Sequence, residues 1–125
     1  MKALILLSLA VASPAMAADQ FDLVCTGFRQ GVPLGHKTPE TVRYRVDLAA
    51  KTWCKEDCST VLSLASVDAG RISFQSASRG VQGYDQYHFV SRTTGEWLNY
   101  MSNPFHNEEG HCEAAPFSGM PSQKF

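Results

Sequence analysis

The sequence lacks the features of several common protein classes. It contains no block of five or more like charges, and its formal net charge is only −1, so it lacks the basic face that nucleic acid requires. Beyond residue 17 there is no second long hydrophobic run, so we expect no membrane insertion. No window has a convincing helical period. We therefore expect an all-β protein that does not bind nucleic acid.

Hydrolase and cofactor motifs are also missing. The sequence has no G-x-S-x-G, S-x-x-K or H-E-x-x-H motif, no glycine-rich phosphate loop and no C-x-x-C-H. Asp85, His88 and Ser91 carry the three groups of a catalytic triad, but residues 88 and 91 face opposite sides of a strand. We therefore predict no catalytic residue and no cofactor.

The first seventeen residues have the form of a secretory signal peptide. Lys2 precedes an apolar run over residues 3–12, Pro14 ends that run, and Ala15-Met16-Ala17 supplies a cleavage site. The run is shorter than the roughly 20 residues that span a bilayer. We expect residues 1–17 to be removed, which leaves one periplasmic or secreted domain over residues 18–125.

Four cysteines remain after the predicted cleavage site. An even number in a short exported chain is typical of two disulfide bonds, and four cysteines allow three pairings. We favour Cys54–Cys58, which closes a short local loop, together with Cys25–Cys112, which joins the first predicted strand to the last.

A spacing of Val, six residues and an aromatic residue occurs three times, at 46–53, 67–74 and 90–97. Side chains around the first copy alternate between apolar and polar, as in a strand with one buried face. The three copies predict three β-hairpins in series. Gly70 and Gly95 would adopt positive φ angles in two of the turns.

The middle hairpin has the shortest turn, so Val67 should pair with Ile72 rather than with Phe74. With strands added at 20–27 and 110–117, we predict an all-β fold. It is a single small antiparallel meander of about eight short strands, curled into a barrel or half-barrel and stapled by disulfides. Loops are expected at 29–40, 76–85 and 102–110, and an irregular tail at about 114–125. In the tail, Phe117, Met120 and Phe125 would cover an open edge or barrel end.

The densest group of potential metal ligands is "HNEEGHC" at 106–112, where His106, Glu108 and His111 are candidate metal ligands. The two histidines are five residues apart, which matches no standard metal motif and points them to opposite faces of a strand. Cys112 is expected to be oxidised. We therefore favour a solvated polar loop before the last strand over a metal site.

Five aromatic residues fall within a short stretch: Tyr84, Tyr87, Phe89, Trp97 and Tyr100. If exposed, they could form a ligand- or protein-binding face, because aromatic residues are enriched at such sites. If buried, they would fill the core of a small β domain. We favour the core, because a small sheet needs bulky side chains to fill it.

The segments "FDLVCTG", "YRVDL", "WC" with a second Cys four residues on, "SRTTGEW" and "CEAAPFSG-P" occur in one chain. In this pattern the sequence resembles a group of small exported bacterial proteins of unassigned function, over nearly all of residues 18–125. The resemblance implies export and the fold, and it implies no catalytic residue. The chain is more distantly similar to periplasmic lysozyme inhibitors, which are small disulfide-linked antiparallel barrels.

The sequence thus predicts a non-catalytic binding module of the cell envelope, with a protein or glycan of the envelope as its partner. One alternative is a periplasmic enzyme inhibitor of the lysozyme-inhibitor kind. Another is a small metal-dependent hydrolase built around His106, Glu108 and His111.

Overall fold

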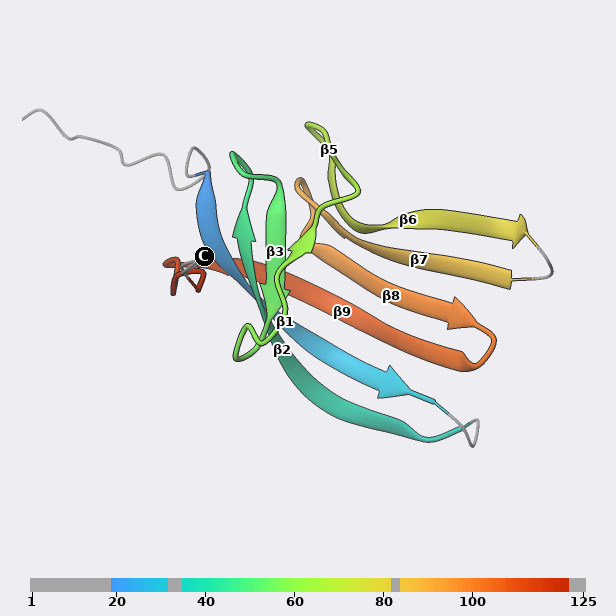
Figure 1. The fold of residues 1–125 in the computed structure, drawn as a ribbon. Coiled ribbons are helices and arrows are strands. Elements are labelled where there is room, and N and C mark those ends of the chain that lie inside the picture. Colours follow the sequence, from blue (N-terminus) through green and yellow to red (C-terminus); the bar gives the residue numbers. More distant parts are fainter. Residues whose placement is uncertain (1–18, 32–34, 82–83, 122–125) are drawn as a thin grey trace, which may run out of the picture.

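A computed structural model describes residues 19–31, 35–81 and 84–121, so the predicted signal peptide and Phe125 lie outside the described residues. Within these ranges the chain forms nine β-strands (Figure 1). They are β1 (Gln20–Gln30), β2 (Lys37–Asp47), β3 (Thr52–Lys55), β4 (Leu62–Ser63), β5 (Ser66–Val67), β6 (Arg71–Val81), β7 (Tyr84–Ser91), β8 (Glu96–Ser102) and β9 (Phe105–Ala115). No helix in the described ranges is long and apolar enough to cross a membrane.

The nine strands form one antiparallel sheet in the order β4-β3-β2-β1-β9-β8-β7-β6-β5. Strands that are adjacent in the sheet are also consecutive in the chain, except that β1, the first strand, pairs with β9, the last; the consecutive strands β4 and β5 lie at opposite edges. The sheet curls into a half-barrel, and the long strands fan apart at the end where β6 stops and β2 begins (Figure 1). The predicted all-β antiparallel fold is confirmed.

The two edge strands, β4 and β5, are separated by only Leu64 and Ala65. The backbone N–H of Leu64 donates to Lys51 O at 2.9 Å, and that of Ala65 donates to Ser73 O at 2.9 Å. This segment therefore joins the two edges of the sheet, so that at one end of the half-barrel the curl of strands is continuous from edge to edge. The first strand of the predicted middle hairpin is therefore divided into β4 and β5 by the crossing from one edge of the sheet to the other.

The predicted hairpin pairs are present. Val46 lies opposite Trp53 and Val90 lies opposite Trp97. In the middle hairpin Val67 lies opposite Ile72, as its shorter turn required.

Of the two turn glycines, Gly95 has the predicted positive φ, 78°. The prediction for Gly70 was wrong, because the φ angle of Gly70 is not positive. The Asp68 carboxylate instead organises that turn, accepting the N–H groups of Gly70 at 2.8 Å and Arg71 at 2.9 Å.

The predicted loops at 29–40, 76–85 and 102–110 were too long. Most of their residues belong to β1, β2, β6, β7 and β9. Pro39 had indicated a loop, but it lies where β2 has no outer neighbour, because β3 pairs only with Tyr44–Asp47. An edge position needs no N–H donor, so proline is tolerated there. Over 76–81, β6 keeps its pairing with β7 through register shifts.

The core lies on the concave face of the half-barrel and contains apolar side chains from both halves of the chain. Tyr44 is its centre and is fully buried. Its ring lies 4.8 Å from Phe74, 5.6 Å from His88, 5.8 Å from Trp53 and 6.1 Å from Trp97, measured between centroids. These contacts join strands from opposite sides of the curl.

Both predicted disulfides are present, Cys25–Cys112 and Cys54–Cys58. Cys25 and Cys112 lie directly opposite each other on β1 and β9, so this bond joins the first and last strands. Two residues further along, Gly27 lies opposite Gly110. A Cβ atom on Gly27 would lie 1.9 Å from Glu109 O, so the close approach of these strands requires glycine.

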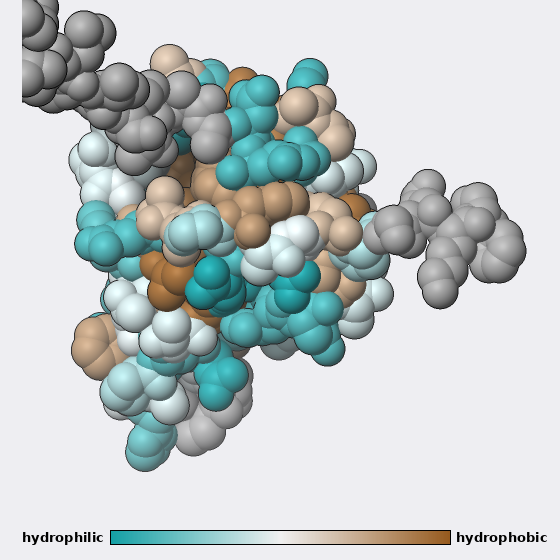
Figure 2. Space-filling view, turned by 90° about the vertical axis from the view of Figure 1, so that its left-hand side faces the viewer, coloured by the Kyte–Doolittle hydropathy of each residue, from teal (hydrophilic) through white to brown (hydrophobic). Residues whose placement is uncertain are grey.

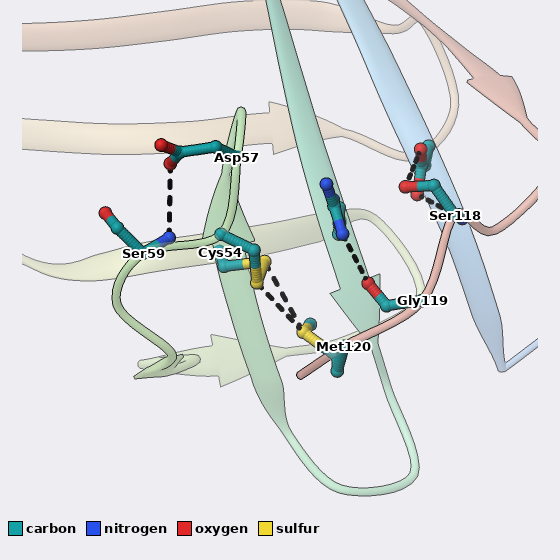
Figure 3. The surroundings of a disulfide bond; sticks show 9 residues. Cys54, Asp57, Ser59, Ser118, Gly119 and Met120 are labelled. Carbon is teal, nitrogen blue, oxygen red and sulfur yellow. Dashed lines mark hydrogen bonds between the residues drawn. A yellow bond between two sulfur atoms is a disulfide. The ribbon is translucent and has the colours of Figure 1, made fainter. Parts of the chain in front are cut away.

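Residues 116–121 of the tail cross the outer face of β1, β2 and β3 (Figure 3). Arg45 Nη1 donates to Gly119 O at 2.9 Å, and the Met120 sulfur lies 3.4 Å from Cys54 Sγ. A disulfide sulfur carries no proton, so the second contact is van der Waals packing. Met120 therefore covers a sheet face, whereas the sequence predicted that it would cover an edge or barrel end.

Seen from the side of the tail, hydrophobic side chains lie near the middle with hydrophilic ones around them (Figure 2).

Candidate functional site

The outer face of the half-barrel carries aromatic rings. Residues directly opposite each other on antiparallel strands share a face, and Tyr87 lies opposite Tyr100 on β7 and β8. Their ring centroids are 6.2 Å apart with an interplanar angle of 27°, and Phe105 packs edge-on against Tyr100 at 6.1 Å. All three side chains are half-buried. They form one part of what we call the outer aromatic face.

A second row of this face crosses four strands. Phe89 lies opposite Leu98, Leu98 opposite Glu109, and Glu109 opposite Phe28. Phe28 is 49% exposed and is one of the few large hydrophobic residues exposed in the described part of the chain. The outer aromatic face thus comprises Phe28, Tyr87, Phe89, Leu98, Tyr100 and Phe105.

The sequence had favoured a core position for the aromatic cluster at 84–100. That interpretation holds for Trp97, which is fully buried, whereas Tyr84, Tyr87, Phe89 and Tyr100 are only half-buried. The reason is strand alternation: Trp97 faces the interior, and Tyr87, Phe89 and Tyr100 have the opposite parity on their strands.

Two arginines border the outer aromatic face. The Arg71 guanidinium lies 3.7 Å from the centre of the Phe89 ring, a cation–π contact. Arg79 Nε donates a hydrogen bond to the Tyr87 hydroxyl at 3.1 Å, and this bond raises the pKa of Arg79. The face therefore combines aromatic surface with two guanidinium groups and with the carboxylate of Glu109, which lies between Leu98 and Phe28.

A second group of side chains lies inside the half-barrel, toward its open end. Glu108 is only 2% exposed, and its Oε1 accepts hydrogen bonds from Asn99 Nδ2 at 2.8 Å and from His106 Nε2 at 2.9 Å. Burial opposes ionisation of Glu108, but these hydrogen bonds, with Glu40, outweigh burial and lower its pKa. Glu108 is thus a buried carboxylate that stays charged.

Glu40 reaches the same interior region from β2, and its Oε1 is buried without a hydrogen-bond partner of its own. Burial and the neighbouring Glu108 raise the pKa of Glu40 to about 7. Two neighbouring carboxylates repel each other when both are ionised. A proton on Glu40 removes this repulsion and lets Glu40 donate a hydrogen bond to Glu108.

Deeper in the core, His88 is 5% exposed and its Nε2 lies 3.2 Å from the Tyr44 hydroxyl. Burial lowers the pKa of His88 to about 4, so the ring is neutral at pH 7. The interior therefore changes from aromatic at its centre to acidic toward its open end.

The structure brings together two of the three candidate metal ligands. His106 and Glu108 are in contact on the inner face, but His111 lies on the outer face, 3.9 Å from Glu113. Residues 105–115 are a strand, so the expected solvated loop was wrong for Glu108. Across the described ranges, no three His, Cys, Asp or Glu side chains are grouped to hold a metal ion.

Sequence reasoning missed Glu40, Asn99 and Phe28. Glu40 fell in a predicted loop, Asn99 had no motif, and Phe28 stood one residue beyond the predicted first strand. Their roles depend on the register between β1, β2, β8 and β9, which pairs residues far apart in the chain.

No family model matches this chain, and no curated protein or solved structure gives a significant match. The two disulfides are compatible with an oxidising compartment. Any functional proposal therefore depends on the fold and on the side chains described above.

Proposed function

We propose that this protein is an exported, non-catalytic binding module of the cell envelope, and that its partner contacts the outer aromatic face. The observation that carries this proposal is the group of aromatic rings on the outer face of β7, β8 and β9, away from the part of that face that residues 116–121 cross (Figure 3). Exposed aromatic surface is costly in water, and it marks interaction sites when it is contiguous.

The chemistry of this face suits a protein or glycan of the envelope. Tyr87 and Tyr100 offer broad apolar surfaces with polar hydroxyl ends, and such side chains dominate binding energy at interfaces. Arg71 and Arg79 add donors that could pair with acidic groups of the partner. The signal peptide predicted at residues 1–17 and the two disulfides support an envelope or extracellular location.

Co-sedimentation with isolated envelope fragments tests this proposal. We expect the mature protein to sediment with the fragments, and Phe28→Ser or Tyr100→Ser to reduce the bound fraction at least fivefold. Leu62→Ser is the matched control, because Leu62 is also an exposed apolar residue, 43% exposed, but lies on β4. Circular dichroism verifies that each variant is folded.

Treatment of the fragments identifies the partner class. Loss of binding after proteolysis indicates a protein, and loss after periodate oxidation indicates a glycan. Equal binding by wild type and both aromatic variants, or no binding by wild type, would overturn the proposal.

A further inference from the structure

A cavity of about 320 Å³ opens at the end of the half-barrel where β1 begins. Its floor is apolar and is formed by inner-face residues of four strands: Phe21, Leu23, Ile72, Val90, Cys112 and Ala114. One wall is the β7–β8 turn, residues 91–95, with His111 beside it. The lining includes neither Glu40 nor Glu108, and none of the six residues of the outer aromatic face.

The rim differs in chemistry from the floor. Ser91, Thr93 and Thr94 supply hydroxyl groups, and Arg92 supplies a guanidinium. No Asp or Glu is among the described residues that line the cavity, so a negative charge on a ligand would meet no like charge in the lining.

Local hydrogen bonds hold the rim in place. Arg92 Nη1 donates to Asp68 O at 2.8 Å, and the Arg92 backbone N–H donates to Gly70 O at 2.9 Å. Gly95 has its positive φ at the end of the same turn, where a Cβ atom would lie 2.5 Å from His111 Cε1. Arg92, which lines the apolar cavity, is therefore held in an organised turn.

We propose that this cavity binds a small amphipathic acid, with its hydrocarbon part on the apolar floor and its acidic group at Arg92. The mouths of β-barrels commonly hold small ligands, and cavities of this volume are at the lower end of the usual range. A charged group is recognised most strongly by a guanidinium, which offers paired donors. This site is independent of the outer aromatic face and of the function proposed for it.

The test uses octanoate, octanol and octylamine as probes of equal chain length, followed by amide chemical shifts of the mature protein at pH 7. We expect octanoate to shift the amides of residues 90–95 and 23, and to bind at least tenfold more tightly than octanol. Octylamine should bind no better than octanol. Equal affinity for octanoate and octanol, or no shifts at these residues, would overturn the proposal.

Two variants locate the site. Arg92→Gln should reduce octanoate affinity roughly tenfold, to that of octanol, since it removes one charge-assisted contact. Arg79→Gln, on the outer face, is the matched control and should leave octanoate affinity unchanged. Thr93→Trp, at an exposed turn position, should block the mouth and abolish binding of both probes. Unaltered octanoate binding by Arg92→Gln and Thr93→Trp would contradict the assignment.

Discussion

Asp22 Oδ2 accepts a hydrogen bond from Ser118 Oγ at 2.7 Å, although 96 residues separate the two in the chain. The Ser118 backbone N–H donates to the other carboxylate oxygen at 3.1 Å, and Arg43 Nε donates to Oδ2 at 2.5 Å. Asp22 is fully buried, so the tail both covers this carboxylate and satisfies it. This contact fixes the tail on the outer face of β1.

Asp22→Asn should lower the free energy of unfolding at pH 7 by about 2 kcal/mol, because hydrogen bonds to a charged group contribute about 1.5–3 kcal/mol. Burial raises the pKa of Asp22, but the bonds from Ser118 and Arg43 outweigh burial and lower it below its usual 3.8. The contribution is therefore present above pH 3.8 and lost as the pH falls through the folded pKa. Urea denaturation should show a difference at pH 7 that shrinks toward pH 2.5. Equal stability at pH 7 would contradict this account, and Asp57→Asn, at an exposed position, is the control.

Glu40 should make the protein less stable as the pH rises. Its folded pKa of about 7 lies above the ordinary 4.5, so its ionisation opposes folding progressively between these values and fully above pH 7. Glu40→Gln cannot ionise and can still donate toward Glu108. We expect this variant to be roughly 1–3 kcal/mol more stable than wild type at pH 8, less than the full pKa shift corresponds to because Glu40 is partly exposed and screened by solvent, and close to wild type at pH 5. Denaturation at both pH values checks this.

Glu113→Gln is the control for Glu40, because the Glu113 side chain is 83% exposed. It should change stability little at either pH. If Glu40→Gln behaves like Glu113→Gln, the two interior carboxyl groups do not share a proton.

Gly27→Ala should prevent folding or lower the free energy of unfolding by more than about 3 kcal/mol. The added methyl group would meet backbone atoms of β9, which cannot rotate away. Gly31→Ala is the matched control, because nothing lies within 4 Å of its Cβ position, and it should be nearly neutral. Thermal unfolding followed by circular dichroism compares the two. A Gly27→Ala protein with wild-type stability would mean that β1 and β9 are further apart than described.

The two disulfides should differ in their contribution to stability. In the loop-entropy description, Cys25–Cys112, which spans 87 residues, contributes about 4–5 kcal/mol. Cys54–Cys58, which spans four residues, contributes about 2 kcal/mol. Paired substitutions, Cys25→Ala with Cys112→Ala and Cys54→Ala with Cys58→Ala, measured by urea denaturation, test this order. The reverse order would contradict the loop-entropy account of these two bonds.

The hairpins were predictable because their signals are local. Val46 and Trp53, or Val90 and Trp97, lie seven residues apart, and the turn between them determines their pairing. The interior cluster was not predictable in the same way. Glu40 and Glu108 lie 68 positions apart, and they meet only because β1 pairs with both β2 and β9.

By itself, the sequence determined the positions of the three hairpins through period-two alternation and turn residues. It also gave the favoured disulfide pairing through the places of its four cysteines, and the predicted export signal through its first seventeen residues. Only the tertiary structure decided which sides of β7, β8 and β9 face inward. It placed Glu108 in the interior, Tyr87 and Tyr100 on the outer face, and the tail across Asp22. The physical reason is that alternation separates the two faces of a strand. Where both faces carry aromatic or apolar side chains, as on β7 and β8, alternation does not show which face is buried. The inner face exists only once the sheet has curled, and this needs the non-local pairing of β1 with β9, where Gly27 and Gly110 let the strands approach.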